Sequence, residues 1–254
     1  MRLRQVALVS SDLDRVTDQL NKVFGLKVAY NDPHIHVYGL KNAVLPAGAG
    51  FLEVVQPVVE TASAARHLKR RGGDAGYMVI LQVSDAPAEA ARAAGEGVRI
   101  VDTIDTPDYY AAHFHPADFG GMLVSFDQQR SEPDLDKVDG DWMPAGPEWR
   151  SHQSDQGVDL RAVTLSSPDP EALAARWAQL LAQPLDTADP LRLPLGRGEV
   201  RFAASDEGAP TLIESLDIAV REPAASRDRA TKAGLDMADD AVLIGGVRWR
   251  AISL

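Results

Sequence analysis

The sequence predicts an α+β protein made of four βαβββ-like modules, which pair into two lobes with curled mixed sheets. Three observations lead to this prediction. An apolar strand followed by a capped helix occurs four times along the chain. Short strand-like runs separated by Gly, Pro or Asp follow each helix. A polar segment divides the second copy from the third, and repeats of this kind usually stack to share a core.

The first two copies are the most clearly marked. Residues 3–9 are predicted to form a strand with alternating apolar residues, residues 10–12 offer helix caps, and Gly25 supplies a left-handed stop. Residues 78–83 form the second strand, and an alanine-rich helix follows and ends at Gly95. We therefore expect one strand and one amphipathic helix at the start of each module.

The third and fourth copies repeat this pattern. Residues 160–165 precede a helix whose apolar stripe includes Leu173 and Trp177, and residues 216–220 precede a helix that ends near Gly234. Further strands are expected at residues 43–46, 51–55, 122–126, 200–203 and 247–252.

The repeats divide the chain into two lobes and a linker. Residues 1–128 form an N-terminal lobe of two modules with the candidate active cleft, residues 129–157 form an interlobe linker, and residues 158–254 form a C-terminal lobe. The linker is rich in Asp, Glu, Pro, Gly and Ser but contains Trp142 and Trp149, which are unusual for a free tether. We expect these two side chains to attach the linker to a lobe, and a role as a lid over the pocket is the alternative.

Composition restricts the partners. The formal charge of −11, from 37 acidic and 26 basic residues, repels phosphate and disfavours nucleic acid. The chain has no Cys, which excludes disulfides, zinc–thiolate sites and a thiol nucleophile. It contains neither a signal-peptide pattern nor about 20 consecutive apolar residues. We expect a cytoplasmic monomer or homodimer that binds a small-molecule substrate or ligand and neither nucleic acid nor a membrane.

Four motifs in the N-terminal lobe resemble the vicinal oxygen chelate (VOC) superfamily of glyoxalase, bleomycin-resistance and extradiol-dioxygenase proteins. LRQVALVSSDLDRV at residues 3–16 is similar to the opening strand and helix cap, and FGLKV at residues 24–28 is similar to the post-helix turn. FLEVVQP at residues 51–57 resembles a ligand-bearing strand, and HPADFGGMLVSF at residues 115–126 resembles the closing hairpin of methylmalonyl-CoA epimerases. Residues 158–254 resemble the family only in their strand-helix pattern, which implies a degenerate VOC lobe.

The resemblance implies an incomplete metal site. In this superfamily a divalent metal, when present, lies in the cleft on His, Gln or Glu side chains. The ligand positions fall here on Gln5, Glu53, Met78 and Ser125. Gln5 and Glu53 offer oxygen donors for Mn, Fe, Co, Ni, Zn or Mg, whereas the Met78 thioether and the neutral Ser125 hydroxyl are poor ligands. Gln5, Met78 and Ser125 are therefore also substrate-binding candidates, and a bound metal or no cofactor both stay open.

Glu53 is the first catalytic candidate. Strand alternation directs its carboxylate into the cleft if Leu52 and Val54 face the other way. A buried carboxylate needs a partner or a raised pKa, so Glu53 is expected to act as a ligand or as an acid–base group. The alternative is a salt bridge with Arg4 or Lys41.

Histidines and tyrosines complete the candidate site. His34 and His36 are predicted on one face of a strand, either as solvated imidazoles or with one facing the cleft. His36 is the second catalytic candidate, since an imidazole that titrates near pH ~6.5 suits proton abstraction beside a carbonyl. His34, Tyr77, Tyr110 and His113 are substrate-binding candidates, and a purely structural histidine is the alternative for His113.

These features indicate three functions. The first is a glyoxalase-like enzyme of the lyase or isomerase type, which moves a proton beside the carbonyl group of a small oxygenated metabolite. The second is a metal-free small-molecule binding protein of the bleomycin-resistance type. The third is an extradiol-type dioxygenase, which requires two histidines and one carboxylate for ferrous iron.

Overall fold

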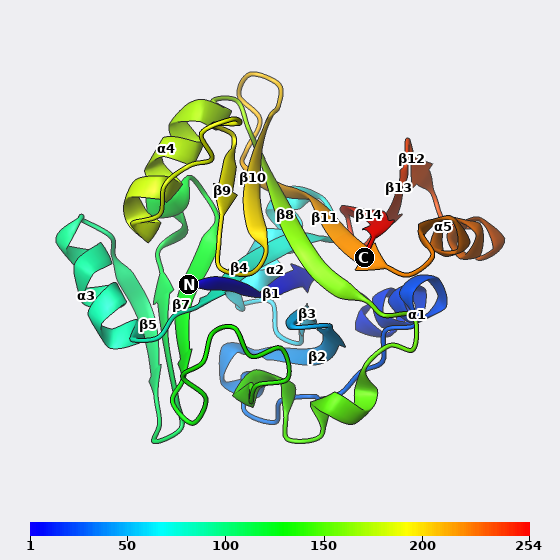
Figure 1. The fold of residues 1–254 in the computed structure, drawn as a ribbon, viewed down its shortest axis with the longest axis horizontal. Helices are drawn as coiled ribbons and strands as arrows, with labels where there is room; N and C mark the ends of the chain where they lie inside the picture. Colours follow the sequence, from blue (N-terminus) through cyan, green and yellow to red (C-terminus); the bar gives the residue numbers. More distant parts are fainter. The chain divides into compact units, whose positions relative to one another are not determined.

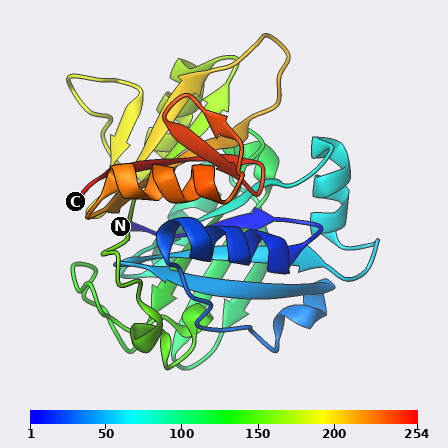
Figure 2. The same cartoon turned by 90° about the vertical axis from the view of Figure 1, so that its right-hand side faces the viewer.

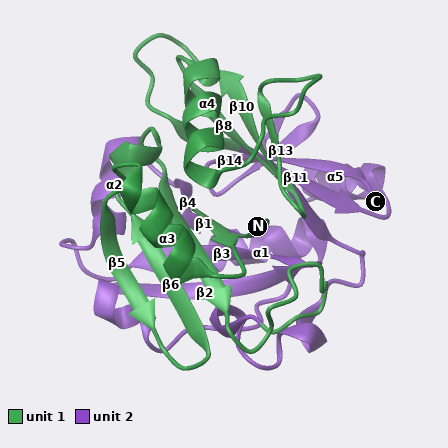
Figure 3. Cartoon of the chain, turned by 60° about the vertical axis from the view of Figure 1, so that its left-hand side comes forward, with its two compact units in different colours: residues 1–4, 78–141, 162–214 green, residues 5–77, 142–161, 215–254 purple.

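The computed structural model describes residues 1–254 and confirms the α+β fold class. Five α-helices and fourteen strands are present, and the strands form two mixed sheets of seven strands each (Figure 1). The chain divides into two compact units, which Figure 3 colours separately. Unit 1 consists of residues 1–4, 78–141 and 162–214, and unit 2 consists of residues 5–77, 142–161 and 215–254. The lobe and linker boundaries expected from the sequence stay a prediction.

Unit 2 contains most of the first module and the C-terminal strands. Its N-terminal elements are β1 (Arg2–Val9), whose residues 5–9 belong to this unit, α1 (Leu13–Phe24), the 3-10 helix η1 (Ile35–Tyr38), β2 (Leu40–Ala47), β3 (Gly50–Pro57) and α2 (Ser63–Arg71). Its C-terminal elements are β11 (Leu212–Val220), α5 (Pro223–Lys232), β12 (Met237–Ala238), β13 (Ala241–Ile244) and β14 (Val247–Ser253). β3 pairs with β1 in parallel and with β2 in antiparallel orientation. β14 pairs with β11 in parallel and with β13 in antiparallel orientation.

α1 forms where the sequence predicts it. The Asp12 side chain accepts a hydrogen bond from the backbone N–H of Arg15 at 3.0 Å, and Gly25, with φ 63°, ends the helix. α5 lies beside α1 in Figure 2, and Arg229 Nε donates to the carbonyl oxygen of Val23 at 2.9 Å. The apolar stripe of α1 is buried and consists of Leu13, Val16, Leu20, Val23 and Phe24.

Strand register determines which side chains share a face of the β2–β3–β1 sheet. Ala7 and Val44 lie directly opposite Glu53 on its two neighbouring strands. Because side chains alternate along a strand, Gln5 and Asn42, each two residues from those positions, point to the same face as Glu53. Three strands therefore bring three polar side chains to one face of this sheet.

Unit 1 contains the second module and part of the third. Its elements are β4 (Ala75–Gln82), α3 (Ala86–Gly95), β5 (Ile100–Asp105), β6 (Tyr109–Phe114), the 3-10 helix η2 (Pro116–Phe119), β7 (Leu123–Gln129), β8 (Asp159–Ser167), α4 (Pro170–Leu181), β9 (Arg192–Pro194) and β10 (Glu199–Ala204). β7 pairs with β4 in parallel and with β6 in antiparallel orientation. Trp177 of α4 packs edge-on against Phe119 and Phe202, with ring centroids 5.4 and 6.0 Å away. These contacts anchor α4 in the core.

The polar segment after β7 is well ordered around its two tryptophans. It contains the short 3-10 helices η3 (Met143–Ala145) and η4 (Trp149–His152). Trp142 and Trp149 are each only 1% exposed, and both pack on Phe51, with ring centroids 6.3 and 5.0 Å away. The expectation that these side chains attach the segment is confirmed.

The strand predicted through residues 34–36 is wrong. These residues belong to the turn of η1, and the Asp32 side chain accepts a hydrogen bond from the backbone N–H of His34 at 2.8 Å. Gly39 then ends the turn with φ 70°. These two residues favour a turn over an extended strand, because the Asp32 side chain accepts a backbone hydrogen bond and Gly39 adopts a positive φ without strain.

The five α-helices are all too short or too polar to cross a lipid bilayer.

The contact between Gly246, directly before β14, and Asp74, directly before the strand that starts at Ala75, gives a test of the packing. Gly246 has φ +74°, and a Cβ atom there would lie 1.8 Å from the carbonyl oxygen of Asp74. Gly246→Ala should therefore lower the free energy of unfolding by about 2 kcal/mol or more, measured by denaturant titration. Gly72→Ala is the matched control, because Gly72 has the same φ of +74° and nothing within 4 Å of the added atom. Equal losses in the two variants would show that the close approach to Asp74 is absent.

Candidate functional site

Glu53 is a buried carboxylate at the centre of β3. Only 8% of its surface is exposed. Its Oε2 accepts a hydrogen bond from Gln5 Nε2 at 2.9 Å, and its Oε1 accepts one from Asn42 Nδ2 at 2.7 Å. The partners are thus two amides, from β1 and β2, and not the salt bridge with Arg4 or Lys41 that was the alternative.

Two donors that cannot accept hydrogen bonds determine the orientation of both amides. Trp142 Nε1 donates to Gln5 Oε1 at 2.7 Å, and the backbone N–H of Asp32 donates to Asn42 Oδ1 at 2.8 Å. An indole N–H and a backbone N–H can only donate, so each must face an amide oxygen. The amide N–H groups of Gln5 and Asn42 are consequently the ones that face Glu53. We call these five residues the Glu53 cluster.

The environment changes the acidity of this carboxyl. Burial raises the pKa of Glu53, and the hydrogen bonds from Asn42 and Gln5 oppose this rise, while the charge of Asp32 adds to it. Burial also raises the pKa of the Tyr77 hydroxyl, which contacts Ser63 Oγ at 3.2 Å and is affected by the charge of Glu53. A buried carboxyl with such a shift is a candidate acid–base group.

The residues of the Glu53 cluster do not fit a divalent metal ion as they are arranged. The oxygen of Gln5 is turned to Trp142 and the oxygen of Asn42 to Asp32, so N–H groups surround the carboxylate of Glu53. Divalent ions of this kind require oxygen or imidazole donors, and an amide N–H is not a ligand. Nowhere in the chain do three His, Asp or Glu side chains lie together in a way that could hold a metal ion. The metal ligation expected for Gln5 and Glu53 stays a prediction that this geometry does not support.

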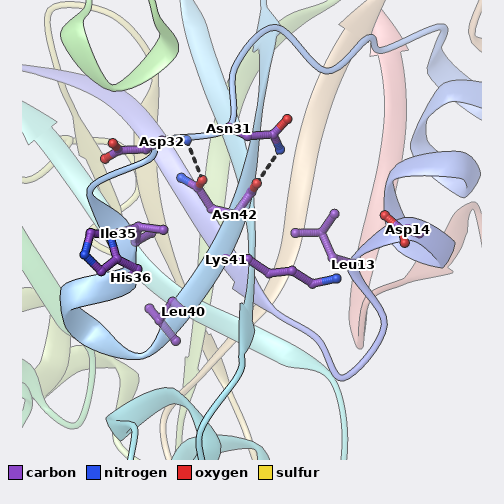
Figure 4. Close-up of a pocket in the computed structure, with 9 residues that line it drawn as sticks. All are labelled: Leu13, Asp14, Asn31, Asp32, Ile35, His36, Leu40, Lys41 and Asn42. Atoms are coloured by element: carbon purple, nitrogen blue, oxygen red, sulfur yellow. Dashed lines mark hydrogen bonds between the residues drawn. The ribbon is translucent and has the colours of Figure 1, made fainter.

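A pocket lies beside the cluster, at the outer edge of β2. Its volume is about 400 Å³, and Figure 4 shows its wall on one side formed by η1 and on the other by the start of α1. Asn42 lines the pocket and also donates to Glu53, so it connects the two. The lining is mixed in character and consists of Leu13, Asp14, Asn31, Asp32, Ile35, His36, Leu40, Lys41 and Asn42.

The two histidines before β2 lie in different environments. His36 is on the pocket wall, and its Nδ1 lies 2.6 Å from the carbonyl oxygen of Pro33. No hydrogen bond joins His36 to Glu53. His34 is exposed at the N-cap position, directly before η1, and is not part of the pocket lining. Its proposed substrate contact therefore has no support from the pocket.

The remaining predicted site residues lie in unit 1, on β4, β6 and β7. Ser125 of β7 lies directly opposite His113 of β6. On the other side of β6, Asp102 of β5 lies opposite His113, and the distance from Asp102 Oδ2 to His113 Nδ1 is 3.7 Å. Burial lowers the pKa of His113, and Asp102 opposes this shift. Met78 is two residues before Ile80, which pairs with Ser125, so Met78 shares the face of Ser125.

Tyr110 lies on the opposite face of β6 from His113, because odd and even positions of a strand alternate. The Arg130 guanidinium lies 5.7 Å from the centroid of the Tyr110 ring. The structure therefore brings His113 and Ser125 together, and it separates Tyr110 from them.

Sequence reasoning missed three members of the Glu53 cluster: Asp32, Asn42 and the site role of Trp142. Alternation puts Asn42 on the same face of β2 as Val44, but only the register of β2 against β3 brings that face beside Glu53. Trp142 gives no such signal, because its contact with Gln5 joins residues that are 137 positions apart.

The hydrogen bond from Trp142 to Gln5 gives a second test. Trp142→Phe leaves the buried oxygen of Gln5 without its donor, so the free energy of unfolding should fall by about 1–3 kcal/mol beyond the loss of ring contacts. Trp149→Phe is the matched control, because the Trp149 indole is equally buried on Phe51 but its N–H has no hydrogen-bond partner. Denaturant titration of both variants measures the difference. A cost for Trp149→Phe as large as that for Trp142→Phe would contradict the hydrogen bond.

A protein-family model and several solved structures are similar to this chain. Residues 6–181 match the family model described as a glyoxalase-like domain. Among solved structures, a mutant of 4-hydroxymandelate synthase from Streptomyces coelicolor is 17% identical, with a TM-score of 0.68 over 92% of this chain and 75% of that chain. It has the same fold across nearly the whole chain.

Methylmalonyl-CoA epimerases are also similar. The enzyme from Mycobacterium tuberculosis is 24% identical over 50% of this chain and 87% of that chain, with a TM-score of 0.46. A variant from Streptomyces coelicolor in complex with 2-nitronate-propionyl-CoA is 19% identical over 51% of this chain and 97% of that chain, with a TM-score of 0.47. No curated protein matches the chain.

Proposed function

Because the chain belongs to the glyoxalase-like domain family, we propose that it is an enzyme that transfers a proton beside the carbonyl group of a small oxygenated metabolite, with Glu53 as its acid–base group. One observation carries this proposal. A buried carboxyl is held between two amides, and one of these amides lines a pocket of a size that suits a small molecule.

The chemistry follows from the environment of Glu53. The ionised carboxylate accepts the proton from the carbon next to the carbonyl group. The electron pair of that C–H bond forms a C=C bond, and the π pair of the carbonyl group moves onto its oxygen. Return of the proton to the carbon completes an isomerisation, or loss of a neighbouring group completes a lyase reaction. The raised pKa makes Glu53 a stronger base than an exposed carboxylate, and the amide hydrogen bonds keep the ionised form accessible.

The pocket offers groups that suit an oxygenated ligand. Leu13, Ile35 and Leu40 provide apolar contacts, and Lys41 and Asn42 provide hydrogen-bond donors. His36 on the pocket wall remains the candidate for a second acid–base group.

A metal-free binding protein of the bleomycin-resistance type is the second candidate. The observation that favours it is the complete pairing of the Glu53 carboxylate, which needs neither metal nor substrate to satisfy it. The two functions differ in one outcome, since only the enzyme exchanges a carbon-bound proton. The extradiol-type dioxygenase is not proposed, because the chain does not assemble two histidines and one carboxylate.

The proposed enzyme depends on the Glu53 carboxylate. Glu53→Gln should lower the rate of solvent deuterium exchange at the α-carbon of carbonyl metabolites by at least about 100-fold. The exchange is measured by proton NMR with a panel of 2-oxo acids, hydroxyketones and thioesters. Glu60→Gln is the control, because Glu60 follows β3 and is exposed. Exchange that survives in Glu53→Gln, with Glu60→Gln unchanged, would rule out Glu53 as the base.

Stability should depend on pH through the same group. Because the folded-state pKa of Glu53 is raised, its contribution to stability is fully present below the ordinary glutamate pKa of about 4.3 and is lost as the pH rises through the folded-state pKa. The free energy of unfolding of the native protein should therefore fall relative to that of Glu53→Gln as the pH rises over this window. Urea titrations of both proteins at a series of pH values measure this difference. A difference that stays constant with pH would show that Glu53 titrates normally.

A further inference from the structure

We propose that unit 2 binds the surface of an anionic lipid bilayer through one exposed patch of apolar and basic side chains. This inference goes beyond the proposed function and does not depend on it, because no residue of the patch lines the pocket or forms a hydrogen bond with Glu53. The patch, which we call the α2 patch, consists of Val37, Tyr38, Val58, Val59, Arg66, Lys69, Arg70 and Arg71.

The apolar part of the α2 patch comes from two turns that lie against each other. Val37 and Tyr38 belong to η1, and Val58 and Val59 directly follow β3. The backbone N–H of Val58 donates to the carbonyl oxygen of Gly39 at 2.8 Å and so joins the two turns. Between 41% and 69% of each of the four side chains is exposed. Single exposed apolar side chains are common in proteins, but a group of four in adjoining turns, bordered by charged residues, indicates a binding surface.

The basic part follows from the periodicity of α2. Arg66, Lys69 and Arg70 are three and four positions apart, so they share one face of the helix, and all three are exposed. Ala64 and His67 are buried on the opposite face. No salt bridge engages Lys69 or Arg70. The helix therefore presents a row of cations to solvent.

The two parts of the α2 patch lie beside each other. Arg66 Nη1 donates a hydrogen bond to the backbone carbonyl oxygen of Thr61, in the segment that connects Val59 to α2. Figure 2 shows α2 and η1 on the same side of the molecule, at the right of the view. A Cβ atom added at Gly72 or Gly73 would have no neighbour within 4 Å, so open space surrounds the end of the helix. The α2 patch thus consists of turns and a helix end that project into solvent.

The charge of the α2 patch is opposite to that of the whole chain. The formal net charge of the chain is −11, whereas the patch is basic, with Glu60 as an exposed acidic residue in its turn. Asp74, shortly after α2, forms a salt bridge with Arg15. Because salt screens exposed charges beyond about 10 Å, the local balance decides what approaches this surface. The expectation that the chain avoids membranes rested on the lack of a spanning segment, which surface binding does not require.

This combination fits a lipid surface better than a folded partner. A stable protein interface uses about 20–30 residues on each side, and the α2 patch is much smaller. Binding at a bilayer surface instead combines a shallow apolar insertion with attraction between basic side chains and anionic headgroups. A second copy of the chain would bring like charges together if the same patch met itself across a twofold axis.

Co-sedimentation of the full chain with lipid vesicles tests the electrostatic part. The chain should bind vesicles of phosphatidylglycerol mixed with phosphatidylcholine and should not bind vesicles of phosphatidylcholine alone. The double change Lys69→Gln and Arg70→Gln should weaken binding about 25-fold, because each basic side chain near an anionic bilayer contributes about fivefold in affinity. Arg227→Gln with Lys232→Gln is the matched control, since it removes the same charge from α5, outside the α2 patch. Equal weakening by the two double changes would overturn the proposal, because net charge would then govern binding.

A fluorescent probe tests the apolar part. The chain has no Cys, so a single introduced thiol can be labelled selectively. Val37→Cys carrying an environment-sensitive nitrobenzoxadiazole dye should shift its emission to shorter wavelength when phosphatidylglycerol vesicles are added, because this side chain enters the apolar boundary. Val101→Cys is the control, since Val101 is 52% exposed on β5 of unit 1, and its emission should stay unchanged. Vesicle binding without a shift at position 37 would contradict insertion of the turn.

Two further results would overturn lipid binding. The first is a lack of sedimentation with phosphatidylglycerol vesicles by the native chain. The second is binding of soluble polyglutamate in place of vesicles, lost with Lys69→Gln and Arg70→Gln, which would make an acidic protein segment the partner of the α2 patch. Neither result bears on the proposed function, because deuterium exchange is measured without lipid and depends on Glu53. Circular dichroism establishes that each variant is folded.

Discussion

The arrangement of the candidate site depends on the hydrogen-bonding needs of one buried carboxyl. A carboxylate that leaves water must regain donors, and Glu53 obtains them from Gln5 on β1 and Asn42 on β2. Each amide can supply an N–H only if its oxygen is satisfied elsewhere, which Trp142 and the backbone of Asp32 accomplish. Two chains of hydrogen bonds therefore end at Glu53. One runs from the backbone of Asp32 through Asn42, and the other runs from Trp142 through Gln5. This constraint explains why Gln5, Asn42 and Glu53 lie together on one face of the β2–β3–β1 sheet.

Much of the fold could be predicted from the sequence because its signals are local. Apolar alternation and helix caps lie within about ten residues of one another, as at β1 and α1. The burial of Glu53 also followed from alternation. Its partners did not, since Asn42 depends on the register of β2 and Trp142 on a contact across 137 positions. The resemblance placed Gln5 beside Glu53, but which end of the Gln5 amide faces the carboxylate depends on a tryptophan outside the family motifs. The turn at residues 34–36 was missed because two histidines in alternation imitate a strand.

The two compact units differ in whether the buried polar groups at the predicted site positions have hydrogen-bond partners. In unit 2 the carboxylate of Glu53 and the oxygens of its two amides all have partners. In unit 1, His113 lies opposite Ser125 and beside Asp102, and the buried hydroxyl of Ser125 has no hydrogen-bond partner. The four positions at which the sequence resemblance predicted metal ligands thus contain a hydrogen-bonded acid–amide pair in unit 2 and a neutral hydroxyl and a thioether in unit 1. The glyoxalase-like fold is conserved in this chain while the chemistry of its side chains differs from a metal-ligand set.

The bond between Trp142 and Gln5 also affects the order in which the site can assemble during synthesis. Gln5 leaves the ribosome early, together with the strands that bear Asn42 and Glu53, but the indole that orients it is made more than a hundred residues later. Until then the Gln5 amide lacks the donor that fixes the direction of its oxygen. The finished chemistry is therefore a property of the chain at a late stage of its translation, and a fragment that stops at residue 128 has the strands of the site without its final orientation.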